Sequence, residues 1–321
     1  MNTPTKLGAF GLGLAVVFTV ALGLGRVAGP APAAPAAAHD QHDEPTGQAA
    51  VAVGLPAGLQ VTQDGYRLQP ISAELGTGAP QPFRFRILEP DGAPVTGYTT
   101  SHDKDLHLIV VRRDLAGFQH VHPTLAADGT WSIPLAVAAP GQYRVFADFQ
   151  PAGHTGGLVL GVDVPAPGDY RPRPLPTVQR ETTVDGYTVT LTGDLTPGGS
   201  SKLTLAVSKD GTPVTDLQPY LGAYGHLVAL REGDLAYLHV HPDGEPGDGR
   251  TQAGPDVVFH AEVPSAGNYR LYLDFRHAGT VRTAEFTAVA GTPAPAAEPV
   301  PSATTPAPAP SGHDADGHTH Q

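Results

Sequence analysis

An internal repeat constrains the fold of this chain more than any other feature of its sequence. Short motifs recur in the same order in the two halves. They are DGY at 64–66 and 185–187, DGAPVT at 91–96 with DGTPVT at 210–215, and GQYR at 141–144 with GNYR at 267–270. The two copies span residues 58–165 and 181–290, so one structural unit is built twice.

Each copy consists of short apolar or alternating runs separated by turn signals. Examples are FRFRIL at 83–88, HLIVV at 107–111 and YRVFADF at 143–149. The 39 Gly and 34 Pro among 321 residues supply turns, and no helical periodicity of useful length appears after residue 25. Strands at a spacing of about 8–12 residues are typical of a sandwich. The sequence therefore predicts an all-β protein with two tandem immunoglobulin-like β-sandwich domains.

An uncharged run of 18 residues occupies positions 7–24, between Lys6 and Arg26. This length is at the low end for a membrane span and exceeds a usual signal-peptide core. We interpret residues 1–27 as an N-terminal transmembrane helix, with a cleaved signal segment as the alternative. Both interpretations place the rest of the chain outside the cytoplasm, either anchored in the cell membrane or secreted.

The segments around the repeats are rich in Ala and Pro. We expect residues 28–57 to be a disordered linker and residues 291–321 a disordered His-rich tail, because both lack the apolar surface that would offset the entropy of ordering. A Pro-rich linker at 166–180 joins the two repeats.

Charge and sulfur content exclude several kinds of site. The net charge is -12 and Lys and Arg form no cluster, so nucleic acid is not an expected partner. The chain has no cysteine, which excludes disulfides, thiolate zinc sites and iron–sulfur clusters. The only methionine is Met1, so the soft sulfur ligands that suit Cu(I) are missing.

Both copies contain three histidines at the same spacing, His-x12-His-x-His. They are His107, His120 and His122 in the first copy and His226, His239 and His241 in the second. The last two of each set point to the same face of a strand. In a hairpin with a four-residue loop, the first lies opposite the third, with Cβ atoms about 4.5–5.5 Å apart. Three imidazoles gathered in this way suit a divalent metal with nitrogen ligands at about 2.0–2.1 Å.

Comparison of the two copies supports a special role for these histidines. Between the sixteen-residue segments 107–122 and 226–241, six positions are identical, and three of the six are the histidines. Neighbouring apolar positions have diverged while the histidines have not. A metal site is the favoured interpretation, and exposed or hydrogen-bonded histidines are the alternative.

Two acidic residues lie in the aromatic strands that follow. Asp148 is in YRVFADF and Asp274 is in YRLYLDF. A carboxylate in such a strand is costly to bury alone. Each aspartate fits a fourth ligand, an acceptor that orients one imidazole, or a residue of a turn or salt bridge. Imidazole and carboxylate suit Cu(II), Zn(II) and Ni(II), and the stability order favours Cu(II), with Zn(II) next.

The string HLIVVRRDLAGFQHVHP followed by PGQYRVFADF resembles bacterial envelope proteins with YtkA-like, FixH-related immunoglobulin-like domains. It is also similar to His-rich secreted proteins associated with heavy-metal handling. The resemblance covers both repeats and implies an extracytoplasmic β-sandwich with a copper role. Carried over residue by residue, it gives the metal ligands His107, His120, His122, Asp148, His226, His239, His241 and Asp274. The second copy departs from the pattern at Arg231-Glu232, where the first has two arginines.

Three functional hypotheses follow. The first is a membrane-anchored, extracytoplasmic protein that sequesters or delivers a metal ion, with the membrane and another envelope protein as partners. The second is a protein-interaction scaffold with structural histidines, in which Phe118 and Tyr237 are exposed contact residues. The third is a zinc hydrolase, because three histidines with an open position can activate water. Since the sequence offers no convincing general base or nucleophile elbow, we do not expect an enzyme.

Overall fold

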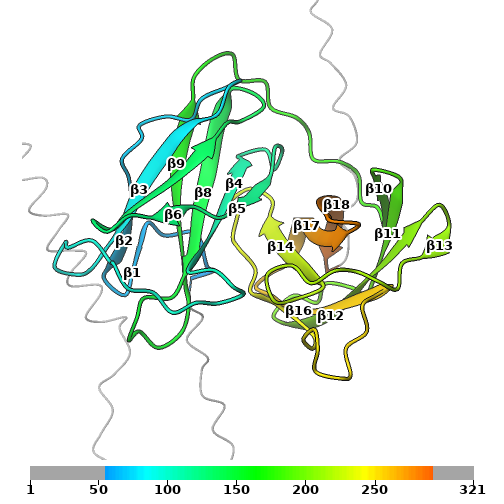
Figure 1. Cartoon of the computed structure of the whole chain (residues 1–321). Coiled ribbons are helices and arrows are strands. Elements are labelled where there is room, and N and C mark those ends of the chain that lie inside the picture. The colour runs from blue at the N-terminus through cyan, green and yellow to red at the C-terminus, as the bar shows by residue number, and fades with distance from the viewer. Residues whose placement is uncertain (1–54, 292–321) are drawn as a thin grey trace, which may run out of the picture. The chain divides into compact units, whose positions relative to one another are not determined.

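The structure, a computed structural model, describes residues 55–291, all of which belong to one compact unit. This part of the chain is built from eighteen β-strands and contains no helix (Figure 1). None of its segments is therefore a helix able to cross a membrane. The predicted transmembrane helix at 1–27, and most of the linker and tail predicted at 28–57 and 291–321, lie outside the described residues.

The first repeat is a sandwich of two antiparallel sheets. One sheet has the order β1-β2-β3-β7-β6 and the other the order β5-β4-β8-β9. The strands are β1 (Thr62–Gln63), β2 (Tyr66–Pro70), β3 (Gln81–Leu88), β4 (Leu106–Arg112), β5 (Gln119–Val121), β6 (Thr124–Leu125), β7 (Thr130–Leu135), β8 (Gly141–Phe149) and β9 (Leu158–Ala166). Phe85 and Trp131 from one sheet pack with Leu108 and Val145 from the other to form the core.

The second repeat has the same two-sheet plan. Its sheets have the orders β10-β11-β12-β16-β15, with β13 paired to β12, and β14-β17-β18. The strands are β10 (Glu181–Val184), β11 (Tyr187–Thr192), β12 (Gly199–Lys209), β13 (Thr212–Pro213), β14 (Gly225–Arg231), β15 (Val240–Pro242), β16 (Asp256–Val263), β17 (Gly267–His277) and β18 (Thr280–Ala290). The immunoglobulin-like sandwich predicted for each copy is confirmed as a two-sheet antiparallel architecture.

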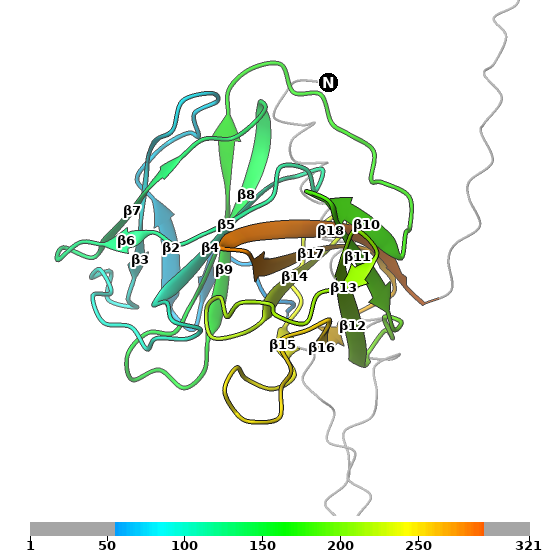
Figure 2. The same ribbon diagram turned by 45° about the vertical axis from the view of Figure 1, so that its right-hand side comes forward.

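The first strand of each histidine motif is buried on both faces. In β4, Leu108 and Val110 face the core of their own sandwich. Ile109 and Val111 point the other way, into a third apolar cluster shared with Val228, Leu230 and Tyr272 of the second repeat. Burial on both faces explains why this segment is a continuous apolar run rather than an alternating one. In both views, β4 of the first repeat lies beside β14 of the second (Figures 1 and 2).

Aromatic residues close this contact between the repeats. Phe118 stacks on Tyr272 with ring centroids 3.9 Å apart. The Tyr272 hydroxyl donates a hydrogen bond of 2.6 Å to the Leu115 carbonyl. The ring centroids of Tyr237 and Phe146 lie 5.6 Å apart in the same cluster. Phe118 and Tyr237 are therefore packed between the repeats, and the prediction that they are exposed contact residues is wrong.

Two predicted linkers take part in the packing. Ala57, at the end of the linker predicted at 28–57, forms a β-bridge with Tyr237 of the second repeat, so this end is ordered. In the Pro-rich segment 166–180, which contains no strand after Ala166, Leu175 packs against the shared cluster. Both segments tie the repeats together.

Candidate metal centre

The three histidines of the first repeat converge on one point. In the β4–β5 hairpin, Ile109 is paired with His120 and Leu108 with Val121, so the next step places His107 opposite His122. Because alternate strand residues share a face, all three histidines project to the same side. This confirms the predicted hairpin register in the first copy.

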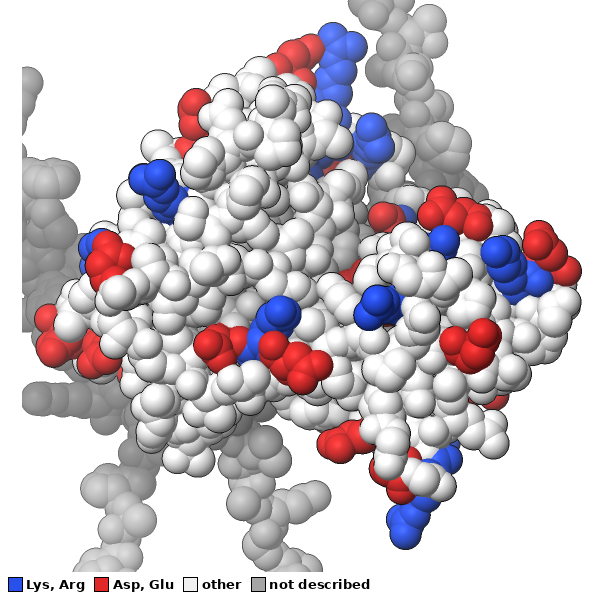
Figure 3. Space-filling view, in the orientation of Figure 1, with Lys and Arg blue, Asp and Glu red and all other residues white. Residues whose placement is uncertain are grey.

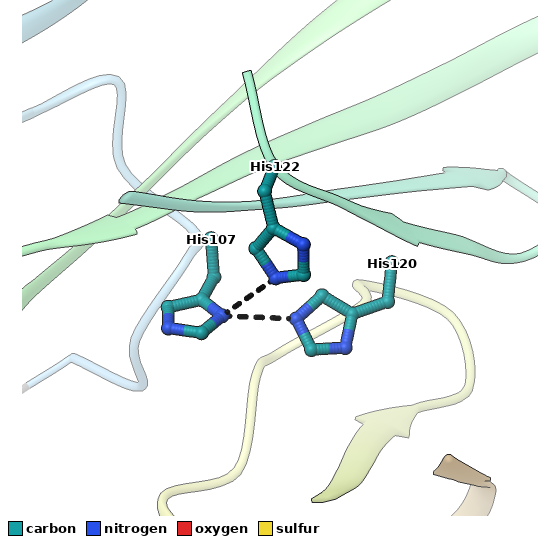
Figure 4. A group of neighbouring side chains, drawn as sticks. All are labelled: His107, His120 and His122. Atoms are coloured by element: carbon teal, nitrogen blue, oxygen red, sulfur yellow. Dashed lines mark hydrogen bonds between the residues drawn. The ribbon is translucent and has the colours of Figure 1, made fainter. Parts of the chain in front are cut away.

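The rings are spaced as ligands of one ion would be. His107 Nδ1 lies 3.1 Å from His120 Nε2 and 3.2 Å from His122 Nε2. The three nitrogens lie within 4.8 Å of one another, and the rings are turned toward one another (Figure 4). Tetrahedral ligands at about 2.0–2.1 Å from a metal would be separated by about 3.3 Å. The three nitrogens could thus bind a divalent cation with only small adjustments.

A backbone carbonyl fixes the tautomer of His107. Its Nε2 lies 3.1 Å from the Ser101 carbonyl oxygen, which can only accept a hydrogen bond. The ring therefore carries its hydrogen on Nε2, and in the neutral form Nδ1 presents a lone pair to the other two rings.

A carboxylate from the second repeat fixes the tautomer of His120. His120 Nδ1 lies 2.8 Å from Asp274 Oδ2. Asp274 is only 3% exposed, and its other oxygen accepts a hydrogen bond of 2.6 Å from the Thr283 hydroxyl. The hydrogen of His120 is therefore on Nδ1, and in the neutral form of the ring Nε2 presents a lone pair to His107. Such carboxylate–imidazole contacts orient metal ligands and raise their basicity.

The two anchored tautomers aim two lone pairs at each other. At a separation of 3.1 Å this arrangement is repulsive unless a proton or a metal ion lies between the nitrogens. Burial and the neighbouring His120 lower the pKa of His107 to about 3, and the same two causes lower the pKa of His122 to about 4. His107 and His122 are therefore neutral imidazoles at neutral pH.

The second repeat does not build the same group. His226 matches His107, because its Nε2 lies 2.8 Å from the Tyr220 carbonyl, six residues upstream as Ser101 is from His107. His239 and His241 instead contact each other, with ring centroids 4.0 Å apart. In the described part of the chain the first repeat's histidines form the one cluster suited to a metal. The predicted second triad is wrong in its geometry.

The cause is the point at which the chain changes sheets. In repeat 1 the chain stays paired with β4 through Val121 and reaches β7 only at Thr124. In repeat 2 the Leu238 N–H still donates to Ala229 of β14, but the His239 carbonyl already accepts from Glu262 of β16. The crossing therefore follows the His-x-His pair in one copy and precedes it in the other.

The two aspartates occupy equivalent strand positions but have different surroundings. Asp148 is paired with His107 across β8 and β4, and Asp274 with His226 across β17 and β14. Neither belongs to the ligand group. Asp274 serves as an acceptor that orients an imidazole, one of the predicted alternatives, but the imidazole is in the other repeat.

Sequence reasoning missed the turns that hold the first histidines. Residues 101–104 and 220–223 form equivalent hairpin turns whose first carbonyls accept from His107 and His226. The central residues have positive φ, 50° and 60° in the first turn and 54° and 71° in the second. These are values of type I′ turns. The segments read SHDK and YLGA, so no shared letter reveals the repeat.

A protein-family model described as a domain of unknown function, DUF8832, matches residues 60–166 and 182–291. The chain belongs to this family. The two DUF8832 matches lie within two residues of the repeats inferred from the sequence. No curated protein matches the chain. The predicted kinship with YtkA-like, FixH-related envelope proteins stays a prediction.

Solved structures resemble the DUF8832 pair only distantly. The Escherichia coli adhesin FdeC is 15% identical, with 72% of this chain and 65% of that chain covered and a TM-score of 0.23. A Salmonella alpha-2-macroglobulin reacted with methylamine is 14% identical, with 75% and 15% covered and a TM-score of 0.22. The D0-D1 domain of intimin is 11% identical, with 69% and 96% covered and a TM-score of 0.19. The chain thus spans less than two thirds of the length of the FdeC and alpha-2-macroglobulin chains. The sandwich assignment is based on the strand topology above.

Charged side chains are scattered over the face shown in Figure 3. Acidic and basic groups of the described residues stand singly or in small mixed groups on an otherwise uncharged surface.

Proposed function

We propose that this protein is an extracytoplasmic metal-binding protein that holds a divalent transition-metal ion on His107, His120 and His122. The observation that supports this most strongly is the convergence of His107 Nδ1 and His120 Nε2, 3.1 Å apart, with His122 Nε2 3.2 Å from His107 Nδ1. A metal ion at this point would accept coordinate bonds from all three nitrogens.

The ligand set selects the class of metal. Three imidazoles without thiolate or thioether favour Cu(II) over Zn(II) by the stability order and disfavour Cu(I). Three protein ligands leave at least one position open for water or for a ligand from a partner. An open position suits a protein that passes its ion on, so we propose sequestration or delivery as the role.

The location follows from the sequence around the repeats. The apolar run at 7–24 and the Ala- and Pro-rich segment after it support an anchor and a tether, which would hold both sandwiches outside the cytoplasm. The partners in this proposal are the metal ion, the membrane and an envelope protein that exchanges the ion.

The scaffold hypothesis depended on Phe118 and Tyr237 as exposed contact residues. Phe118 and Tyr237 pack against the cluster between the repeats and are partly buried there. Metal binding is therefore the function that the described residues support best.

The test uses the full chain with its tail histidines replaced, because these could bind metal weakly. They are His39, His42, His313, His318 and His320. Calorimetric titration with Cu(II) should show a tight binding step that disappears when His107, His120 and His122 are replaced by Ala. The control is His260→Ala, an exposed histidine of β16 outside the group, which should retain that step. A tight step that survives the triple replacement contradicts the proposal.

A further inference from the structure

All three motif histidines of the second repeat line one cavity, although they do not form a site of their own. The cavity has a volume of about 380 Å³, and His226, His239 and His241 are on its wall. His107 and His120, two of the three proposed ligands in the first repeat, are on the same wall. The histidines of the second repeat therefore share a cavity with the triad.

The outer part of this cavity carries exposed imidazoles. His239 and His241 are both exposed, with ring centroids 4.0 Å apart. His102, in a turn of the first repeat, is also exposed and lines the cavity. Burial and the nearby His241 lower the pKa of His102, and the same two causes lower the pKa of His239. The rings of His102 and His239 are therefore neutral at neutral pH, the form in which imidazole binds a metal.

His226 connects this outer group with the triad. Its ring centroid lies 5.3 Å from that of His102, within the range of 5.0 to 5.3 Å found in the triad. The ring centroids of His120 and His107 are 6.2 and 6.4 Å from that of His226. The Nε2–H of His226 donates a hydrogen bond of 2.8 Å to the Tyr220 carbonyl, so Nδ1 of the neutral ring carries a free lone pair. Imidazoles thus follow one another from the exposed part of the cavity to the triad.

The cavity can hold an ion only weakly outside the triad. Among the described residues, the triad is the one group that brings three ligand atoms within reach of one ion. Elsewhere in the cavity an ion would have one or two imidazole ligands, and weak binding allows it to move on. The charged side chains on the described wall are Lys104, Asp105 and Asp148, so acidic groups outnumber basic ones. A wall of this charge favours the entry of a cation.

We propose that this cavity is the entry and exit route of the metal ion, with His239, His241, His102 and His226 as transient ligands along it. This inference rests on the proposed metal-binding function. It gives the second copy of the His-x12-His-x-His motif a role, because the first copy holds the ion and the second passes it between the solvent and the triad. An ion that keeps an imidazole ligand at each step exchanges faster than one that must be released directly into water.

The experiment compares the rate of metal release with the affinity, in the full chain with Ala at the five tail histidines. Release of Cu(II) to an excess of a chromogenic chelator is followed by stopped-flow absorbance, and affinity is measured by competition at equilibrium. We expect release to be at least about tenfold slower in three variants. They are His226→Ala, His102→Asn and the double variant His239→Ala with His241→Ala. A residue on the route speeds entry and exit by the same factor, so the affinity of the triad should be unchanged.

The two measurements separate a route from other roles. Release rates that are unchanged in all three variants overturn the route and leave the triad site standing. An affinity that falls while release becomes faster would show that these residues hold the bound ion, which also overturns the route. Failure of the proposed function appears in a different measurement, the equilibrium titration of the triple Ala variant of the triad.

A matched control and a mild variant complete the design. His260 is exposed and is paired with His241 across β16 and β15, but it does not line the cavity. His260→Ala should therefore change neither the release rate nor the affinity, and slower release in this variant would contradict the route. His102→Asn guards against loss of folding, because φ of His102 is 50°, a conformation that Asn tolerates well.

Discussion

The two repeats share a histidine spacing but not a histidine site. In the first, β5 stays beside β4 long enough to bring His120 and His122 to His107. In the second, the chain leaves β14 before His239, and His239 and His241 join β16 and do not gather with His226. The same His-x12-His-x-His spacing is therefore not sufficient for a site. The strand with which the His-x-His pair is hydrogen-bonded decides whether the three imidazoles meet.

The difference extends to the aspartates. Each is paired with the first histidine of its own repeat, yet Asp274 bonds to the triad of the other repeat and Asp148 bonds to nothing described. The closed site therefore depends on both repeats, although all of its ligands come from one.

The largest expected effect is on metal affinity when equivalent histidines are replaced. We expect His120→Ala to weaken the tight Cu(II) step by more than about 100-fold, because it removes a metal ligand. Loss of a residue that only hydrogen-bonds to a ligand typically lowers metal affinity by about 10–100-fold. His239→Ala, the equivalent change in the second repeat, should leave that step unchanged. Competition titration against a chelator of known affinity measures both, and equal losses in the two variants would contradict the difference between the repeats.

Replacement of the equivalent aspartates should give the next largest effect. Asp274→Asn retains the shape of the residue but removes the charge that orients His120 and raises its basicity. We expect a loss of about 10–100-fold in affinity at the triad. Asp148→Asn should not affect the triad step. The same competition titration applies, and a triad weakened equally by both changes would show that the contact across the repeats has no special role.

Acidification should destabilise the metal-free protein. Burial lowers the pKa of His107 to about 3 and those of His122 and His226 to about 4, below the ordinary 6.5 of an unfolded chain. As the pH falls below about 6.5, these histidines are protonated in the unfolded state but not in the folded state. The free energy of unfolding therefore falls. Asp148, with its pKa raised to about 6, opposes this trend between pH 6 and 4, but it is one group against three.

Urea unfolding of the metal-free chain at pH 7.5 and pH 5 measures this effect. The loss is at most about 1.4 kcal/mol per pH unit for each net proton. His107→Ala should make the pH dependence shallower. Stability that rises on acidification would show that the rings are protonated in the folded state.

The sequence was sufficient to predict some of these features but not others. The alternating runs predicted the sandwiches, and the hairpin spacing predicted the register that places His107 opposite His122. These features depend on contacts between neighbouring strands. The crossing at His239 depends on competition between β14 and β16, and the Asp274 contact depends on how two sandwiches pack. No local pattern encodes either of these long-range choices.

The continuous apolar run at 107–111 did contain a signal for the packing of the repeats. A strand buried on one face alternates, and this one does not, because Ile109 and Val111 meet the second repeat. The same holds for Val228 and Leu230 in β14. A strand that is apolar on both faces, in a domain whose other strands alternate, therefore predicts that a second domain packs against its outer face.

The smallest predicted effect concerns the hydroxyl at the contact between the repeats. Tyr272 donates to the Leu115 carbonyl, while its repeat equivalent, Phe146, has no hydroxyl. Tyr272→Phe makes the repeats alike at this position and should cost about 1 kcal/mol of unfolding free energy, because one buried hydrogen bond is lost. Phe146→Leu, a packing control, should retain the hydroxyl bond. Urea unfolding measures both, and an unchanged stability in Tyr272→Phe would mean that the bond contributes nothing.

Anomalous diffraction from a copper-soaked crystal would locate the ion itself. The structure predicts a peak about 2.0–2.1 Å from His107 Nδ1, His120 Nε2 and His122 Nε2, with His120 still bonded to Asp274. A crystal that takes up copper elsewhere and leaves these three nitrogens without a peak would show that the converging imidazoles of the first repeat are not a metal site.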